Sequence, residues 1–256
     1  MRILLTNDDG VHAAGLKLLE RIASQFSDDV WIVAPETDQS GVAHSFSLSS
    51  PLRLREVAPK HFAVQGTPTD CVLMACKRIL ADKPPDLVLS GVNRGQNVAE
   101  DVTYSGTIAA AIEGTLLGIK SIALSQSYGG IEGRERPIWD AAEAFAPQAI
   151  QKILDIGIPP GVLVNVNFPP CAAADVKGVV VAAQGRRDAE LLRIEERRDG
   201  RNIPYYWLMF QRAGFTPGQG TDLEALAAHK VSVTPLRIDL TDEAERRRYA
   251  EAFAAG

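Results

Sequence analysis

Long apolar runs are missing from this sequence. No stretch of its 256 residues approaches the about 20 apolar residues that a membrane-spanning helix needs. One arginine and a short apolar run open the chain, a pattern unlike a secretory signal peptide. The three cysteines form no Cys-x-x-Cys pair, and an odd number of thiols cannot all be joined in disulfides. These features predict a soluble protein of the reducing cytoplasm without a membrane partner.

An excess of positive charge is missing too. The chain has 27 lysine and arginine residues against 32 aspartate and glutamate residues, a formal charge of −5. Such a surface is poorly suited to a nucleic-acid backbone, so we expect no stable nucleic-acid partner. Short basic clusters are flanked by or interleaved with acids, which favours solvated faces. They lie at residues 186–187, 197–198 and 246–248.

What the chain does contain is an ordinary globular composition, 46% hydrophobic and 23% charged, with a length suited to one large core. Short apolar runs alternate with segments of helical periodicity, which predicts an α/β fold with a doubly wound parallel sheet. Strands are expected at residues 3–5, 30–35, 86–91, 121–125 and 162–170, a hairpin at 52–57 and 62–66, and helices near 13–26, 67–80, 105–118 and 138–155. Pro147 should kink or split the last of these helices.

The pattern changes at about residue 171. Strand-like runs at 178–184, 204–210 and 229–240 are separated by charged or glycine-rich loops, without clear crossover helices. This predicts an antiparallel, β-rich extension used in assembly. We therefore expect one domain over residues 1–256, with a core at 1–170 and an extension at 171–256.

The first ten residues, MRILLTNDDG, indicate where a site should lie. Asp8 and Asp9 directly follow the first buried strand. Ligands of open α/β sheets bind beyond the carboxyl ends of the strands. Two adjacent carboxylates repel each other unless a cation lies between them, which favours a metal or phosphate site. The alternative is a strand-to-helix turn in which one aspartate caps the helix.

Two further strand ends meet the same edge of the predicted sheet. Ser40 follows the second strand, and Asn93 and Asn97 follow the strand at 86–91. Carboxylate, hydroxyl and amide oxygens suit a hard cation such as Mg²⁺ or Mn²⁺, whereas zinc spacing of His and Cys is missing. The alternative for the two asparagines is a turn-forming role.

Ser105, Gly106 and Thr107 open an alanine-rich helix. A helix N-terminus offers backbone N–H groups and partial positive charge, and Gly106 would let an anion approach the backbone. Simple N-capping by Ser105 or Thr107 is the alternative. Together with Asp8 and Asp9, this segment favours a device that grips a phosphate.

These motifs resemble the SurE-type survival proteins. The resemblance rests on TNDDG, the SG of DQSG, QGTPTDC, PDLVLSGVNRGQN, YSGTIAAAIEG and GTD…VSVTPLRIDLT, and spans residues 1 to about 242. It implies a Rossmann-like, three-layer core and a C-terminal extension that forms dimers or tetramers. It also implies metal-dependent 5′/3′-nucleotidase activity on nucleoside monophosphates. Metal positions would be Asp8, Asp9, Ser40 and Asn93, with phosphate contacts at Asn97, Ser105, Gly106 and Thr107.

Four residues, at three places in the chain, depart from the family pattern. Gln39 stands where an arginine is frequent, Ala99 where a glycine is frequent, and His229-Lys230 where Gly-Tyr is frequent. None is an expected metal ligand, although Ala99 affects the loop beside Asn97.

The resulting hypothesis is a phosphomonoesterase with one divalent metal, Mg²⁺ or Mn²⁺, in which Asp8 and Asp9 are catalytic. Asp9 would orient or deprotonate a water molecule, or Asp8 would act as a nucleophile. The alternative function is a metal-dependent nucleotide sensor without catalysis. Activity on polyphosphate, the preferred base and the phosphate position are left open.

Overall fold

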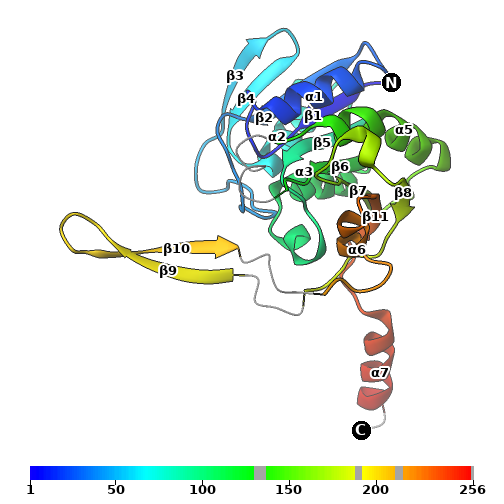
Figure 1. The fold of residues 1–256 in the computed structure, drawn as a ribbon. Helices are drawn as coiled ribbons and strands as arrows, with labels where there is room; N and C mark the ends of the chain where they lie inside the picture. Colours follow the sequence, from blue (N-terminus) through cyan, green and yellow to red (C-terminus); the bar gives the residue numbers. More distant parts are fainter. Residues whose placement is uncertain (130–136, 188–191, 211–215, 255–256) are drawn as a thin grey trace.

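The computed structural model describes residues 1–129, 137–187, 192–210 and 216–254. Its main feature is a nine-stranded sheet in the order β3-β4-β2-β1-β5-β6-β7-β11-β8 (Figure 1). The five central strands, in the spatial order β2-β1-β5-β6-β7, are parallel to one another, which confirms the predicted α/β fold. They are β1 (Ile3–Thr6), β2 (Val30–Pro35), β5 (Leu87–Arg94), β6 (Lys120–Gln126) and β7 (Val162–Phe168).

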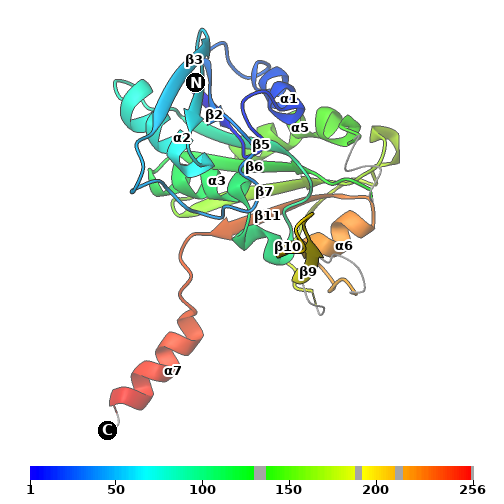
Figure 2. The same ribbon diagram turned by 90° about the vertical axis from the view of Figure 1, so that its left-hand side faces the viewer.

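Helices cover both faces of the sheet and make three layers (Figure 2). On one face, α1 (Ala14–Ala23) and α5 (Asp140–Ile156) pack on the largest apolar cluster. On the other face lie α2 (Pro68–Met74), which continues as a π-helical turn to Ile79, and α3 (Gly106–Leu116). Because both faces are covered, every residue of β1 is buried, as its unbroken apolar run predicts.

The predicted hairpin forms one edge of the sheet. β3 (Arg53–Ala58) pairs antiparallel with β4 (His61–Gln65), and β4 pairs parallel with β2. The following helix, predicted near 67–80, begins with a capping box: the Thr67 side chain accepts from the N–H of Asp70, and the Asp70 carboxylate accepts from the N–H of Thr67.

The other edge differs from the sequence-based expectation. β11 (Val231–Arg237) pairs antiparallel with β7 and lies inside the main sheet, and β8 (Val179–Val181) pairs parallel with β11. The sheet is therefore mixed and continues beyond the strand at 162–170. The sequence indicates that 229–240 is a strand but carries no local signal for its distant partner.

Two elements project from the rest of the molecule (Figures 1 and 2). β9 (Leu192–Arg198) and β10 (Pro204–Phe210) form a separate antiparallel hairpin. α7 (Glu243–Ala254) has no buried residue. A short helix, α6 (Asp222–Ala227), precedes β11 and was not predicted. The remaining elements are two 3₁₀ turns, η2 (Ala99–Thr103) and η3 (Ala173–Asp175).

The expectation for Pro147 is only partly met by the structure. Pro147 lies inside α5, and the helix continues over 17 residues instead of splitting. Pro147 is only partly buried and Glu143, four residues earlier, is exposed, so water can satisfy the carbonyl that loses its partner. Between the strand predicted at 121–125 and the helix predicted at 138–155, residues 130–136 lie outside the described part. No helix in the described ranges is long and apolar enough to cross a membrane.

Candidate active site

A cavity of about 240 Å³ opens at the carboxyl ends of β1, β2 and β5. It brings together six of the eight predicted site residues: Asp8, Asp9, Ser40, Asn93, Asn97 and Ser105. The rest of the lining consists of Asp38, Gly41, Arg94, Gly95, Gln96, Asp101, Tyr104 and Tyr128. The residues thus converge from four segments that are distant in the sequence, as the topology of a parallel sheet predicts.

Asp8 is a buried acid of the cavity, with 4% of its surface exposed. Its Oδ1 accepts a hydrogen bond of 2.6 Å from the Thr107 hydroxyl. Burial and the neighbouring Asp9 carboxylate raise the pKa of Asp8 to about 7, against an opposing effect of the Thr107 hydrogen bond. The ionised form is therefore costly in the metal-free protein.

Asp9 lies beside Asp8 on the cavity wall. Its Oδ2 accepts a hydrogen bond of 3.0 Å from the backbone N–H of Arg94. Burial raises the pKa of Asp9, partly offset by that N–H group and by the Arg94 charge. A cation beside Asp8 and Asp9 would remove much of this electrostatic cost.

The loop after β2 adds two side chains. Asp38 Oδ1 accepts from both the hydroxyl and the N–H of Ser40, at 2.6 and 2.8 Å. The same loop is tied to β1, because the N–H of Gln39 donates to the Asp8 carbonyl at 2.8 Å. Asn93 donates its Nδ2 to the Gly95 carbonyl at 2.8 Å, so Oδ1 is the atom with which it could ligate a cation.

The N-terminus of α3 packs against Asp8 without facing the cavity at Gly106 or Thr107. Ser105 is the N-cap, and its hydroxyl accepts from the N–H of Ile108. Gly106 lies so close that a Cβ there would be 2.8 Å from Asp8 Cβ. Gly106 and Thr107 are therefore not part of the lining but support Asp8, a role different from the predicted phosphate contact.

Asn97 is held rigidly at the cavity wall. Its Nδ2 donates to Ser125 Oγ at 2.9 Å, its N–H donates to Asn167 Oδ1 at 2.8 Å, and its carbonyl accepts from Asn165 Nδ2 at 2.7 Å. These buried polar groups come from β6 and β7. Their positions explain why asparagine and serine occur inside otherwise apolar strands.

Sequence reasoning missed several parts of the site. Asp38 stands two residues before Ser40, and its acidity could have been noticed beside the Asp8–Asp9 pair. Asp101 and Tyr104 precede the predicted helix start at Ser105, and the sequence analysis predicts no role for either side chain. The interpretation of residues 186–187 as a solvated basic face is wrong for Arg187, whose side chain is 1% exposed and pairs with Glu100 and Asp101.

The donor set fits a hard divalent cation. Asp8, Asp9, Ser40 and Asn93 offer oxygen atoms only, and two of these residues are acids whose pKa values are raised by burial. No group of three His, Cys, Asp or Glu side chains suited to a metal was found among the described residues. A cation here would therefore depend on the hydroxyl and amide oxygens, and on water, for the rest of its coordination.

Comparisons with known proteins agree with this geometry. The family model described as "Survival protein SurE" matches residues 3–191. A protein of Methylorubrum extorquens named 5′-nucleotidase SurE is 64% identical over 255 residues, with complete coverage of both chains. A protein of the same name from Bradyrhizobium sp. is 63% identical and covers 95% of this chain and 96% of its own.

Solved structures lead to the same family. The crystal structure of the SurE protein from Aquifex aeolicus superposes with a TM-score of 0.83 at 38% identity, covering 98% of this chain and all of the other. The family match, the full-length relatives and the shared fold together show that this chain belongs to the SurE family of survival proteins.

Proposed function

We propose that this chain is a 5′-nucleotidase that hydrolyses nucleoside 5′- and 3′-monophosphates to nucleoside and phosphate, with one divalent metal, Mg²⁺ or Mn²⁺. The observation that carries the proposal is the pair of adjacent carboxylates, the buried Asp8 and the half-buried Asp9, in a cavity that also contains the N-cap of α3. The names of the full-length relatives support the same activity.

A pure anion-binding site would gain nothing from two added negative charges. With a divalent cation on Asp8, Asp9, Ser40 and Asn93, the charges balance and a phosphate can bind. When bound, such a cation supplies Lewis acidity and lowers the pKa of water. This favours chemistry over simple binding, and so favours the enzyme over a nucleotide sensor.

The chain's own residues would position the reacting groups. Ser105, the N-cap of α3, is the residue of this helix that lines the cavity, and it is proposed to stabilise negative charge on the phosphoryl oxygens together with the partial positive charge of the helix N-terminus. Because Asp9 Oδ2 is engaged by the N–H of Arg94, Asp9 Oδ1 is the atom proposed to accept a proton from the attacking water. Thr107 and Gly106 fix Asp8 by a hydrogen bond and by close packing.

A second route uses Asp8 as the nucleophile, with an aspartyl-phosphate as intermediate. Acid quenching during turnover of a ³²P-labelled nucleotide separates the two routes. The covalent route traps an acyl phosphate on Asp8, whereas direct attack by water leaves the protein unlabelled. An ¹⁸O label from water then shows which bond breaks in an acyl phosphate, because attack on phosphorus labels the phosphate and attack on the carboxyl carbon labels Asp8.

The test of the function is phosphate release from a panel of 5′- and 3′-nucleoside monophosphates, with polyphosphate included. It is run with Mg²⁺, with Mn²⁺ and with EDTA, on the wild type and on Asp8→Asn. We expect release that requires a metal and is lost in the variant. Tight nucleotide binding without release under any condition would instead establish the sensor.

We also propose that residues beyond 171 mediate self-association into dimers or tetramers, and that the protein acts in the cytoplasm. The β9–β10 hairpin, which projects from the sheet with large exposed apolar side chains, supports the first proposal. Three buried free thiols, Cys71, Cys76 and Cys171, support the second.

A further inference from the structure

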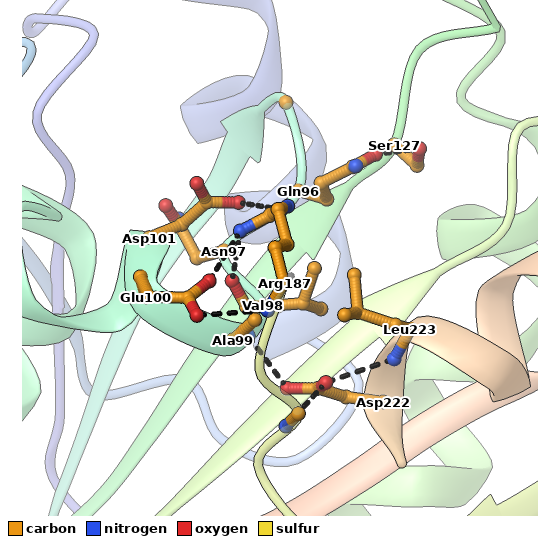
Figure 3. Close-up of polar contacts among 12 residues, drawn as sticks. Gln96, Asn97, Val98, Ala99, Glu100, Asp101, Ser127, Arg187, Asp222 and Leu223 are labelled. Carbon is orange, nitrogen blue, oxygen red and sulfur yellow. Dashed lines mark hydrogen bonds and ion pairs between the residues drawn. The ribbon is translucent and has the colours of Figure 1, made fainter. Parts of the chain in front are cut away.

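Arg187 lies in the extension, yet its side chain is buried against the segment that follows Asn97. Nη1 lies 3.0 Å from Glu100 Oε2, and Nη2 lies 2.9 Å from Asp101 Oδ2. The backbone N–H of Arg187 donates to the other oxygen of Glu100 at 2.8 Å. Figure 3 shows the guanidinium extending to both acids. The Arg187 side chain is 1% exposed. One residue thus clamps two neighbouring residues of η2.

Asp222 holds the same segment from a second direction. Its Oδ2 accepts the N–H of Ala99 at 2.9 Å, and its Oδ1 accepts the N–H groups of Gly185 and Leu223 at 2.8 Å each (Figure 3). The residue is completely buried at the start of α6. The carbonyl of Ala99 also accepts a hydrogen bond, from Gln184 Nε2 at 2.9 Å. Both backbone groups of Ala99 are therefore bound by the extension.

The segment between them has a strained backbone. Ala99 adopts φ of +53°, in the left-handed region that costs an L-residue about 1–2 kcal/mol. The contacts from Asp222 and Gln184 hold it there. Asp101, Tyr104 and Ser105 follow within six residues and all line the cavity.

We propose that Arg187 and Asp222 are positioning residues that hold the turn at 98–101, and with it the cavity wall of Asp101, Tyr104 and Ser105, in the geometry for phosphate binding. The proposal rests on the proposed nucleotidase function. It assigns the C-terminal extension a part in the site of its own chain. Neither residue lines the cavity, so each acts through the turn.

This arrangement predicts a separation of two binding steps. The hydrogen bonds by which Arg187 and Asp222 hold the cavity wall reach residues 98–101, whereas the expected metal positions are Asp8, Asp9, Ser40 and Asn93. Loosening the turn should leave the Mn²⁺ affinity nearly unchanged but weaken phosphate. Misplacement of a site wall by about 1 Å typically lowers the rate of an enzyme by about 100-fold. We therefore expect KM and the inhibition constant of phosphate to rise by about 10- to 100-fold.

The experiment compares Asp222→Asn and Arg187→Lys with the wild type. Asparagine keeps the shape of Asp222 but replaces one acceptor by an NH₂ group. Glu100→Gln is a milder third variant, because the Glu100 side chain is 32% exposed. Arg186→Lys is the matched control for the arginine-to-lysine change, since Arg186 is the exposed neighbour of Arg187. Measurements are Mn²⁺ affinity by calorimetry, inhibition by inorganic phosphate, KM, kcat and the melting temperature.

The expected result is weaker phosphate inhibition and a higher KM at unchanged Mn²⁺ affinity, with faster amide exchange over residues 98–105. Unchanged phosphate constants in a folded variant would overturn the proposal, as would a parallel loss of Mn²⁺ affinity and phosphate binding. Failure of the wild type to hydrolyse any nucleotide would refute the proposed function instead. In that case amide exchange still tests whether Asp222 holds the turn at 98–101. Unaltered protection of residues 98–105 in Asp222→Asn would contradict this positioning role.

Discussion

At the scale of single residues, Asp8 makes the stability of the metal-free protein depend on pH. Its pKa is about 7 in the folded protein against an ordinary value of 3.8, so between these values the folded state binds the proton more tightly than the unfolded state. Stability therefore falls as pH rises from about 4 to about 7, by at most about 4 kcal/mol.

Asp8→Asn removes this penalty. In EDTA we expect the variant to be more stable than the wild type at pH 8, and the two to converge near pH 4. Urea unfolding across that range measures the difference. Asp82→Asn, at a residue whose side chain is 81% exposed, is the control and should follow the wild-type curve. Parallel curves for wild type and Asp8→Asn would contradict the prediction.

Gly106 gives a second prediction at this scale. A Cβ would lie 2.8 Å from Asp8 Cβ and 3.1 Å from Asp8 Oδ2 and from Pro68 Cγ. Gly106→Ala should therefore displace Asp8, reduce metal-dependent activity by at least about 10-fold and cost about 1–3 kcal/mol by overpacking. Gly200→Ala is the control, because no atom lies within 4 Å of its added Cβ. Activity assays and urea unfolding test both effects, and full activity in Gly106→Ala would refute the close-packing argument.

Single residues also show how far the sequence predicts the site. Asp8, Asp9, Ser40 and Asn93 could be found because each follows a recognisable buried strand, and parallel strands end at one edge. Arg187 could not be found, because its partners Glu100 and Asp101 lie more than 80 residues away along the chain. Nothing in the local sequence distinguishes a buried arginine from an exposed one. Thr107 was placed correctly at the start of α3. Its hydroxyl, for which a phosphate contact was expected, donates a hydrogen bond to Asp8.

At the scale of elements, the capping box of α2 connects a loop to the core. The Asp70 carboxylate accepts three hydrogen bonds, from the N–H of Thr67 at 2.8 Å and from the N–H and hydroxyl of Ser47 at 2.9 and 2.8 Å. Asp70→Ala leaves these donors unpaired at a buried site. We expect it to lower the free energy of unfolding by about 2–4 kcal/mol.

Asp242→Ala is the matched control for this cap. Asp242 accepts from the N–H groups of Ala244 and Glu245 at the start of α7, a helix without buried residues. The same chemical change should leave global unfolding within about 0.5 kcal/mol of the wild type. Equal losses of unfolding free energy in Asp70→Ala and Asp242→Ala would contradict the prediction, because the effect of a cap would then not depend on its contact with the core.

Elements were predicted more reliably than their partners. The capping box, the hairpin and the central strands follow from local patterns, such as Thr67 with Asp70 or the unbroken run at Ile3. β11 was recognised as a strand, yet its antiparallel place beside β7 depends on contacts 65 to 75 residues away along the chain. Asp222 starts a helix too short to give a periodic signal, and its role depends on Ala99.

At the scale of the whole molecule, the chain has more surface than a compact protein of its mass. It exposes 13868 Å² at 27.6 kDa, whereas a compact monomer of that mass exposes about 11000 Å². The projecting hairpin and α7 account for much of this shape (Figures 1 and 2). The difference, about 2900 Å², is comparable to the area buried in a permanent protein interface.

The exposed side chains of the hairpin make it the surface that we propose for self-association. Tyr206 is 61% exposed and Leu208 71%, on the same side of β10 because side chains two apart in a strand share a face. Burying each apolar side chain in a partner subunit would contribute about 1.5–3 kcal/mol. Replacing both by glutamate should therefore lower the mass of the assembly measured by light scattering, because paired subunits would bury like charges. Ile156→Glu, at an equally exposed position on α5, should keep the wild-type mass. If the hairpin variant keeps that mass as well, association must use α7 or the edge strand β8, and the hairpin is not the interface.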